Sequence, residues 1–351
     1  MTKLEVRRAL YLTMAVFALQ PLMFGAWLAL IPQVKATLGL NKAELAFALL
    51  GLPIATVPSL QIATRIMHYL GPRRLLAAGF AAQPLVIMLP LSATSQGTLF
   101  LALFVMGFVV AMTQVSLNVY AGRLEKQSAA AIMSRCHGFW ALGLMGGSLL
   151  LVLVIGLGPF AAIALIAVPS AIMGAIAALT LPKLAGEGDG AKPPARRKLR
   201  EIPHALYYIS TFVLAVAMTE GAMSDWAAIY LAERLPSDAT HAGIAVTIFA
   251  GFLAAGRLVG DMLKVRLGVV CLARATLGLA IVGLLLLIAP LPIGFAYLGF
   301  ACIGLGASVG FPLGVSAVAA LDDTYEGANI AIMSSVAICG FLVGPPVIGI
   351  I

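Results

Sequence analysis

Long apolar runs, separated by short polar breaks, dominate this chain. A helix needs about 20 apolar residues to cross a hydrocarbon core roughly 30 Å thick, and most of the runs have this length. The runs are continuous, whereas a membrane β-barrel would alternate polar and apolar residues. We therefore expect an all-α membrane protein with about eleven spans, at 9–31, 43–64, 74–94, 98–119, 130–156, 159–182, 206–231, 242–263, 269–290, 293–318 and 329–350.

Composition excludes a soluble globular protein. The chain is 62% hydrophobic and 10% charged, with a mean hydropathy of +1.05, whereas soluble domains carry about 25% charged residues. The net charge of +8 lies in loops rather than in one patch, which argues against a nucleic-acid partner. The cysteines stand in apolar runs without metal-ligand spacing, so we expect no metal and no cofactor.

The basic residues fix an orientation. If the N-terminus is cytoplasmic, only Lys35, Lys42 and Arg234 of the 22 Lys and Arg residues fall on the outer side. Cytoplasmic loops of membrane proteins carry the excess of Lys and Arg. We therefore expect a multi-pass protein of a bacterial inner membrane with a cytoplasmic N-terminus.

An internal repeat divides the chain. The basic, Gly- and Pro-rich segment 183–203 predicts a cytoplasmic linker between an N-terminal bundle, 1–182, and a C-terminal bundle, 204–351. The tetrapeptide Ala131–Ser134 recurs as Ala331–Ser334, and the loop ending at Gly71 aligns with the loop ending at Gly268. This indicates two parallel six-helix repeats. The spacing would place a twelfth helix beyond residue 351, so we expect the C-terminal bundle to hold five helices and the twelfth to be missing.

A set of short motifs is distributed over the two halves of the chain. It comprises Ser116-Leu117-Asn118-Val119, Met133-Ser134-Arg135, His137-Gly138, Glu220-Gly221-Ala222-Met223, Asp225-Trp226, Gly256-Arg257, Gly260-Asp261 and Gly344-Pro345-Pro346. With them the chain resembles the major facilitator superfamily, and within it the MosC-like group related to fucose permeases. The resemblance implies a monomer that carries a small solute by alternating access. Fucose permeases use carboxylates in spans one and four for coupling. Those spans contain no acid here, so that coupling is not transferred.

Glu220 is a carboxylate inside the apolar run 206–231. It follows Tyr208, a residue type suited to a membrane interface, by about 18 Å of helix at 1.5 Å per residue. We expect no other acid or base at this depth, and hence a carboxyl that stays protonated until water or a cation reaches it. Glu220 is therefore the candidate for proton coupling. A solute contact and a purely structural carboxyl are the alternatives.

Uncharged polar residues in other spans are candidates for solute binding. Gln114 and Asn118 share a face of span four, and we expect His137 at a similar depth in span five. Gln20 and Trp140 could add a hydrogen bond and a stacking face. The alternative for all five is polar packing between helices.

Four charged residues suggest gating or structural roles. Arg257 and Asp261 stand four apart in span eight, so we expect an intrahelical pair or a contact with span eleven. Asp225 is expected near the outer mouth, and Arg135 at the start of span five.

The favoured function is secondary active transport of a small polar solute, sugar- or cyclitol-like, with a proton as the candidate coupling ion. The alternatives are an efflux pump for amphipathic compounds and a membrane sensor that does not transport. The sequence has no P-loop, no HExxH and no nucleophile elbow, so we do not expect an enzyme.

A cysteine placed in the linker tests the orientation. Gly190→Cys should react with a membrane-impermeant maleimide only after the cells are opened, because the linker is expected on the cytoplasmic side. The unsubstituted chain, labelled in parallel, gives the background from the four native cysteines. Labelling at position 190 in intact cells would reverse the orientation.

Overall fold

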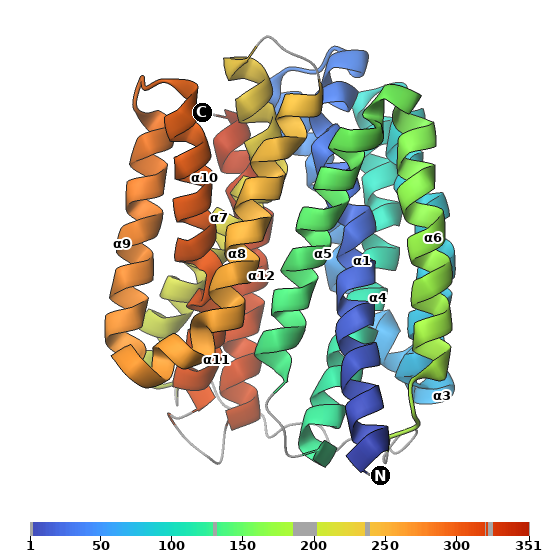
Figure 1. The fold of residues 1–351 in the computed structure, drawn as a ribbon, viewed down its shortest axis with the longest axis vertical. Helices are drawn as coiled ribbons and strands as arrows, with labels where there is room; N and C mark the ends of the chain where they lie inside the picture. Colours follow the sequence, from blue (N-terminus) through green and yellow to red (C-terminus); the bar gives the residue numbers. More distant parts are fainter. Residues whose placement is uncertain are drawn as a thin grey trace.

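The computed structural model describes residues 3–128, 132–184, 202–235, 239–319, 321 and 326–350, and these contain helices but no strand (Figure 1). The α-helices are α1 (Lys3–Leu38), α2 (Lys42–Leu49), α3 (Gly51–Met88), α4 (Gln96–Ser128), α5 (Met133–Val154), α6 (Pro159–Thr180), α7 (His204–Arg234), α8 (Ala239–Leu267), α9 (Val269–Ile288), α10 (Ile293–Ser308), α11 (Gly310–Ala319) and α12 (Glu326–Ile350). Two 3₁₀ turns, η1 (Leu89–Ser92) and η2 (Ile155–Leu157), complete the set.

Ten described helical segments are long and apolar enough to cross a bilayer, which confirms a multi-pass membrane protein. The predicted span 43–64 is not among them, although it is helical and falls on α2 and the first part of α3. A capping box starts this segment: Asn41 Oδ1 accepts from the Glu44 amide, and Glu44 Oε2 accepts from the Asn41 amide, both at 2.9 Å. The linker prediction cannot be followed, because residues 185–201 lie outside the described part of the chain.

The backbone repeats itself at the turns between helices, which confirms the internal repeat. Gly71 has φ 74° and ψ 161°, and Gly268 has φ 76° and ψ 161°. Ala93 and Ala289, at the following helix ends, both have φ −65° and ψ 143°. A positive φ is open to glycine at little cost. Gly71 and Gly268 therefore let one helix turn directly into the next at equivalent points of the two repeats.

The helices pack in two sets, α1–α6 and α7–α12, called here the first and second half. In the first half α1 packs on α5 and α6, and α3 packs on α4 and α6; in the second half α7 packs on α12, and α10 packs on α8 and α9. The halves meet where α5 contacts α8, α1 contacts α7 and α8, and α2 contacts α12. The packing of α1 on α5 thus has its counterpart in the packing of α7 on α12.

Polar links join the halves toward the end of the molecule at which α7 ends. Ser148 of α5 and Thr247 of α8 share a hydrogen bond of 2.8 Å. Glu233 near the end of α7 pairs with Lys35 of α1 at 3.2 Å and with Lys42 of α2 at 2.9 Å. These contacts hold the two halves together at this end.

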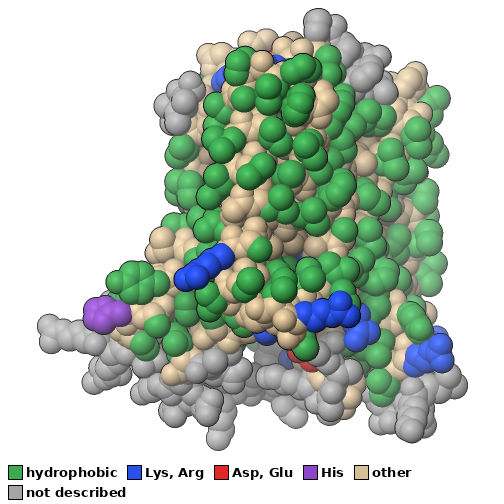
Figure 2. Space-filling model, turned by 60° about the vertical axis from the view of Figure 1, so that its left-hand side comes forward, with side chains coloured by type: hydrophobic (Ala, Val, Ile, Leu, Met, Phe, Trp, Pro, Cys, Tyr) green, Lys and Arg blue, Asp and Glu red, His purple; other side chains and the backbone are tan. Residues whose placement is uncertain are grey.

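The surface fits a bilayer. Apolar side chains cover the body of the molecule, and most of the Lys and Arg side chains visible in Figure 2 gather at the lower end. This is the end at which Figure 1 marks the N-terminus, and the C-terminus lies near the opposite end. Many large apolar side chains, such as Leu85, Leu153 and Ile288, are exposed. Lipid tails can cover them, whereas water would not favour such a surface.

Gly147 permits the close approach of α5 to α1, and this can be tested. A methyl group at Gly147 would overlap the carbonyl oxygen of Leu22. We expect Gly147→Ala to lower the free energy of unfolding by roughly 1–3 kcal/mol, as overpacking does. Gly146→Ala is the matched control, because a methyl group there meets nothing within 4 Å. Equal melting temperatures of the two variants in detergent would contradict the tight α1–α5 contact.

Candidate functional site

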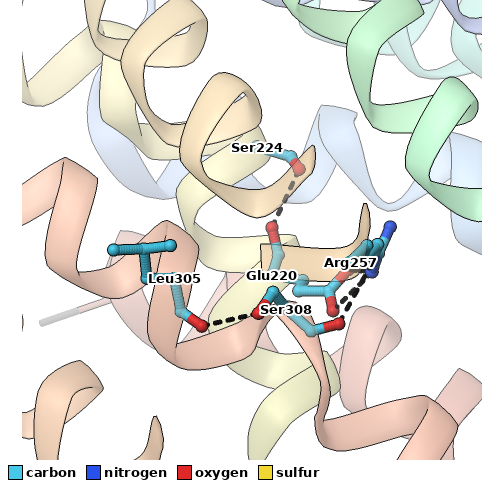
Figure 3. A network of polar contacts seen from close by, with 5 residues as sticks. All are labelled: Glu220, Ser224, Arg257, Leu305 and Ser308. Atoms are coloured by element: carbon cyan, nitrogen blue, oxygen red, sulfur yellow. Dashed lines mark hydrogen bonds and ion pairs between the residues drawn. The ribbon is translucent and has the colours of Figure 1, made fainter. Parts of the chain in front are cut away.

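Glu220 of α7 is paired with Arg257 of α8. Arg257 Nη2 lies 2.9 Å from Glu220 Oε1 and 2.8 Å from Oε2 (Figure 3). The two residues are 9% and 7% exposed. The expectation that no base stands near Glu220 was therefore wrong. Depth counted along α8 placed Arg257 nearer the inner side, but its long side chain carries the charge away from its own Cα.

The end of α10 completes this site. Arg257 Nε donates to the carbonyl oxygen of Ser308 at 3.3 Å. Ser308 is the last residue of α10, and carbonyls at a helix end have no partner within the helix. The Ser308 hydroxyl donates to the Leu305 carbonyl at 2.6 Å, and the Ser224 hydroxyl donates to the Glu220 carbonyl at 2.8 Å. The pair is thus fixed by three helices of the second half.

Arg257 also borders a small cavity between α8 and α11. Its wall includes Gly260, Lys264, Pro312 and Ser316. Lys264 Nζ donates to Ser316 Oγ at 2.9 Å. The guanidinium is therefore held by Glu220 on one side and can meet water or a ligand from the cavity.

The first half contributes an uncharged cluster. Trp140 Nε1 of α5 donates to Gln20 Oε1 of α1 and to Gln114 Oε1 of α4, both at 3.1 Å. Gln20 is buried, and the other two side chains are half-buried. The structure thus brings together three of the predicted solute-binding residues, with the indole as the shared donor.

Asn118 and His137 are placed differently from this cluster. Asn118 follows Gln114 by one turn, is half-buried, and makes no hydrogen bond within the described part of the chain. The His137 ring meets the Phe17 ring edge-on, with centroids 5.7 Å apart. The next residue, Gly138, lies against Leu258 of α8. His137 therefore stands in the part of α5 that faces the second half.

Of the other charged candidates, Asp225 and Arg135 make no contact with the site among the described residues. Asp225 is half-buried and has neither a hydrogen bond nor an ion pair among the described residues. Arg135 is exposed in the first turn of α5. Asp261 lies in α8, but its side chain is outside the described part, so its expected pairing with Arg257 stays a prediction. Sequence reasoning missed the link between Glu233 and the two lysines, since its members are far apart in the chain.

The family model of the Major Facilitator Superfamily matches residues 12–321. The chain belongs to this superfamily. An uncharacterised MFS-type transporter of Yersinia pestis is 29% identical over 344 residues, covering 97% of this chain and 88% of that protein. Membrane protein MosC of Rhizobium meliloti is 26% identical over 334 residues, covering 95% of this chain and 81% of MosC.

Solved structures of the superfamily share this fold. The nucleoside transporter NupG matches with a TM-score of 0.71 at 16% identity, covering 97% of this chain and 90% of that one. A bacterial homologue of the human lysosomal transporter Spinster, in an inward-facing and unoccupied conformation, matches with a TM-score of 0.70 at 12% identity, covering 100% of this chain and 83% of that one. These matches confirm the major facilitator fold, and the superfamily identifies the chain as a membrane transport protein.

A double-mutant cycle tests the Glu220–Arg257 pair of this major facilitator protein. Arg257→Gln removes the cation that pairs with the buried Glu220, and Glu220→Gln removes an anionic partner of the buried Arg257, so each should lower the free energy of unfolding by roughly 3 kcal/mol. The free energy of unfolding of the double variant should fall by clearly less than the sum of the two single losses, because both members of the pair are then uncharged. Denaturant unfolding in detergent measures the free energy of unfolding of the two single variants and the double variant. Strictly additive losses would show that the two side chains do not interact.

Proposed function

We propose that this protein is a secondary active transporter that moves a small polar solute, sugar- or cyclitol-like, by alternating access. The observation that carries the proposal is a pair of polar clusters inside the membrane-spanning helices, one in each half, which we take as the two walls of a solute site. The first half offers the amides of Gln20 and Gln114 around Trp140, and the second half offers the Glu220–Arg257 pair. A solute held by both walls would respond to a movement of one half against the other.

The chemistry of the site suits a neutral, hydroxylated solute. Amides donate and accept hydrogen bonds without charge, and an indole ring offers an apolar face to a sugar ring. Asn118 has an amide without a partner in the described chain, so it is free to bond a hydroxyl group. The ion pair adds no net charge that would demand an ionic solute. NupG, which shares the fold, is a nucleoside transporter, and nucleosides are also hydroxylated ring compounds.

A proton is the coupling ion that this site favours. A proton taken up by Glu220 would remove the negative charge that holds Arg257, and the guanidinium could then turn to the solute or to the cavity beside it. The proton would thus shift the balance between two arrangements of α7 and α8. Ionic links between Glu233 and the lysines of the first half would have to break before that end could open.

The experiment is transport into proteoliposomes. A thermal-shift screen of the purified protein against sugars, cyclitols, nucleosides and drugs supplies the solute, which is then offered in radiolabelled form with an imposed pH gradient. We expect accumulation of a hydroxylated solute that collapses when the gradient is dissipated. Binding of amphipathic drugs alone, with their extrusion, would favour the efflux alternative. Binding without any transport would favour the sensor.

Glu220→Gln separates proton coupling from solute contact. The variant keeps the shape of the side chain but cannot titrate, so it should exchange solute across the membrane yet fail to accumulate it against a gradient. Asp225→Asn is the matched comparison, since Asp225 is the half-buried carboxylate on the same helix. Normal accumulation by Glu220→Gln together with loss in Asp225→Asn would move the coupling to Asp225.

Asn118→Ala tests solute contact. A lost hydrogen bond is worth about 1 kcal/mol, so the dissociation constant of the solute should rise roughly fivefold. The melting temperature without solute should not change, because the amide has no protein partner in the described chain. A fall in melting temperature without a change in affinity would assign Asn118 to packing.

A further inference from the structure

A second cavity lies at the end of the molecule where α7 ends. It has a volume of about 170 Å³ and is enclosed by α7, α9, α10, α12 and the start of α2. Its wall is apolar and aromatic, with Met223, Trp226, Leu287 and Phe300 among its residues. Tyr230 also lines it and is fixed by a hydrogen bond of 2.6 Å from its hydroxyl to the Leu287 carbonyl. The solute site described above shares no residue with this cavity.

The charges at the mouth of this cavity are mostly positive. Lys42 and Glu233 belong to its wall and pair at 2.9 Å, and Lys35 pairs with the same carboxylate at 3.2 Å. Arg234 lies with its guanidinium carbon 5.5 Å from the centroid of the Tyr230 ring and donates to the Ala289 carbonyl. Two lysines thus share the Glu233 carboxylate, and Arg234 stands on the Tyr230 ring beside them. Lys42 and Arg234 are both exposed at their positions.

These three cations are the basic residues that the loop count assigns to the outer side, against nineteen assigned to the other. Basic residues are disfavoured on that side of a membrane protein. Lys42 lines the cavity, and Arg234 and Lys35 each contact a residue that lines it, Tyr230 and Glu233. The cluster therefore points to an anionic group that binds at the mouth, next to an apolar pocket.

We propose that this cavity binds an anionic phospholipid, with part of an acyl chain among the aromatic residues and the phosphate at Lys42 and Arg234. An acyl chain is the apolar ligand that a bilayer supplies at this surface, and a net positive mouth favours a lipid with net negative charge over a zwitterionic one. Bound there, the phosphate would compete with Glu233 for Lys42 and so loosen a link between the halves. The site goes beyond the transport of a solute and does not depend on it.

Trp226 provides a reporter for the acyl chain, since it lines the cavity and is 5% exposed. The protein is placed in nanodiscs that contain phosphatidylglycerol or phosphatidylcholine with the same brominated acyl chains. Bromine quenches tryptophan fluorescence over a short distance. Trp226→Phe removes this reporter and leaves the signal of the two remaining tryptophans, Trp27 and Trp140.

We expect brominated phosphatidylglycerol to quench the wild type more than brominated phosphatidylcholine does, and the excess to vanish in Trp226→Phe. In Lys42→Gln/Arg234→Gln, the preference for phosphatidylglycerol should fall roughly fivefold for each basic residue removed. Arg8→Gln/Arg74→Gln, which removes two exposed basic residues elsewhere on the chain, is the matched control and should keep the preference.

Equal quenching by the two lipids would overturn the proposal, as would an excess that survives in Lys42→Gln/Arg234→Gln. Absence of quenching together with a cross-link between two copies through Trp226→Cys would assign the cavity to a second copy instead. If Trp226→Phe does not fold, the comparison of the two double variants decides the question alone.

Discussion

The ion pair of Glu220 and Arg257 is the interaction on which the centre of the second half depends. A lone charge at such depth is unfavourable, and here two charges and a helix end satisfy one another. Glu220 receives two hydrogen bonds from one guanidinium nitrogen, and Arg257 Nε uses a carbonyl that the end of α10 leaves free. The side chains of α7 and α8 and the end of α10 are thus linked through the one guanidinium group of Arg257.

The two halves share a backbone scheme but differ in chemistry. Gly71 and Gly268 make the same turn, because the close antiparallel return of a helix sets the backbone conformation whatever the side chains are. The polar side chains inside the helices are not repeated in this way. The first half has an indole bonded to two amides, whereas the second half has an ion pair. The repeat thus accounts for the scaffold, whereas the polar side chains inside the two halves differ.

The sequence predicted much of the fold and part of the site. The spans 159–182 and 269–290 agree with α6 and α9 within two residues, because apolar length is a local property that the bilayer selects. Gln20, Gln114 and Trp140 could be named as candidates because polar groups inside apolar runs are also visible in the sequence. The partner of Glu220 was missed, and so was the link of Glu233 to Lys35, which lies 198 residues away. The position of a residue along its own helix can be counted from the sequence, but this count does not show which neighbouring helix the side chain faces.

The sequence by itself determined that this protein is helical, lies in a membrane, repeats its architecture and carries ionisable groups inside its spans. Each of these follows from hydrophobic length, charge or local identity, which the chain displays without being folded. Only the tertiary structure decided that Arg257 pairs with Glu220, that Trp140 joins two amides, and that Lys42 and the Tyr230 ring under Arg234 line one cavity. Such pairings depend on the rotation of each helix about its axis and on the reach of long side chains, and packing alone fixes both.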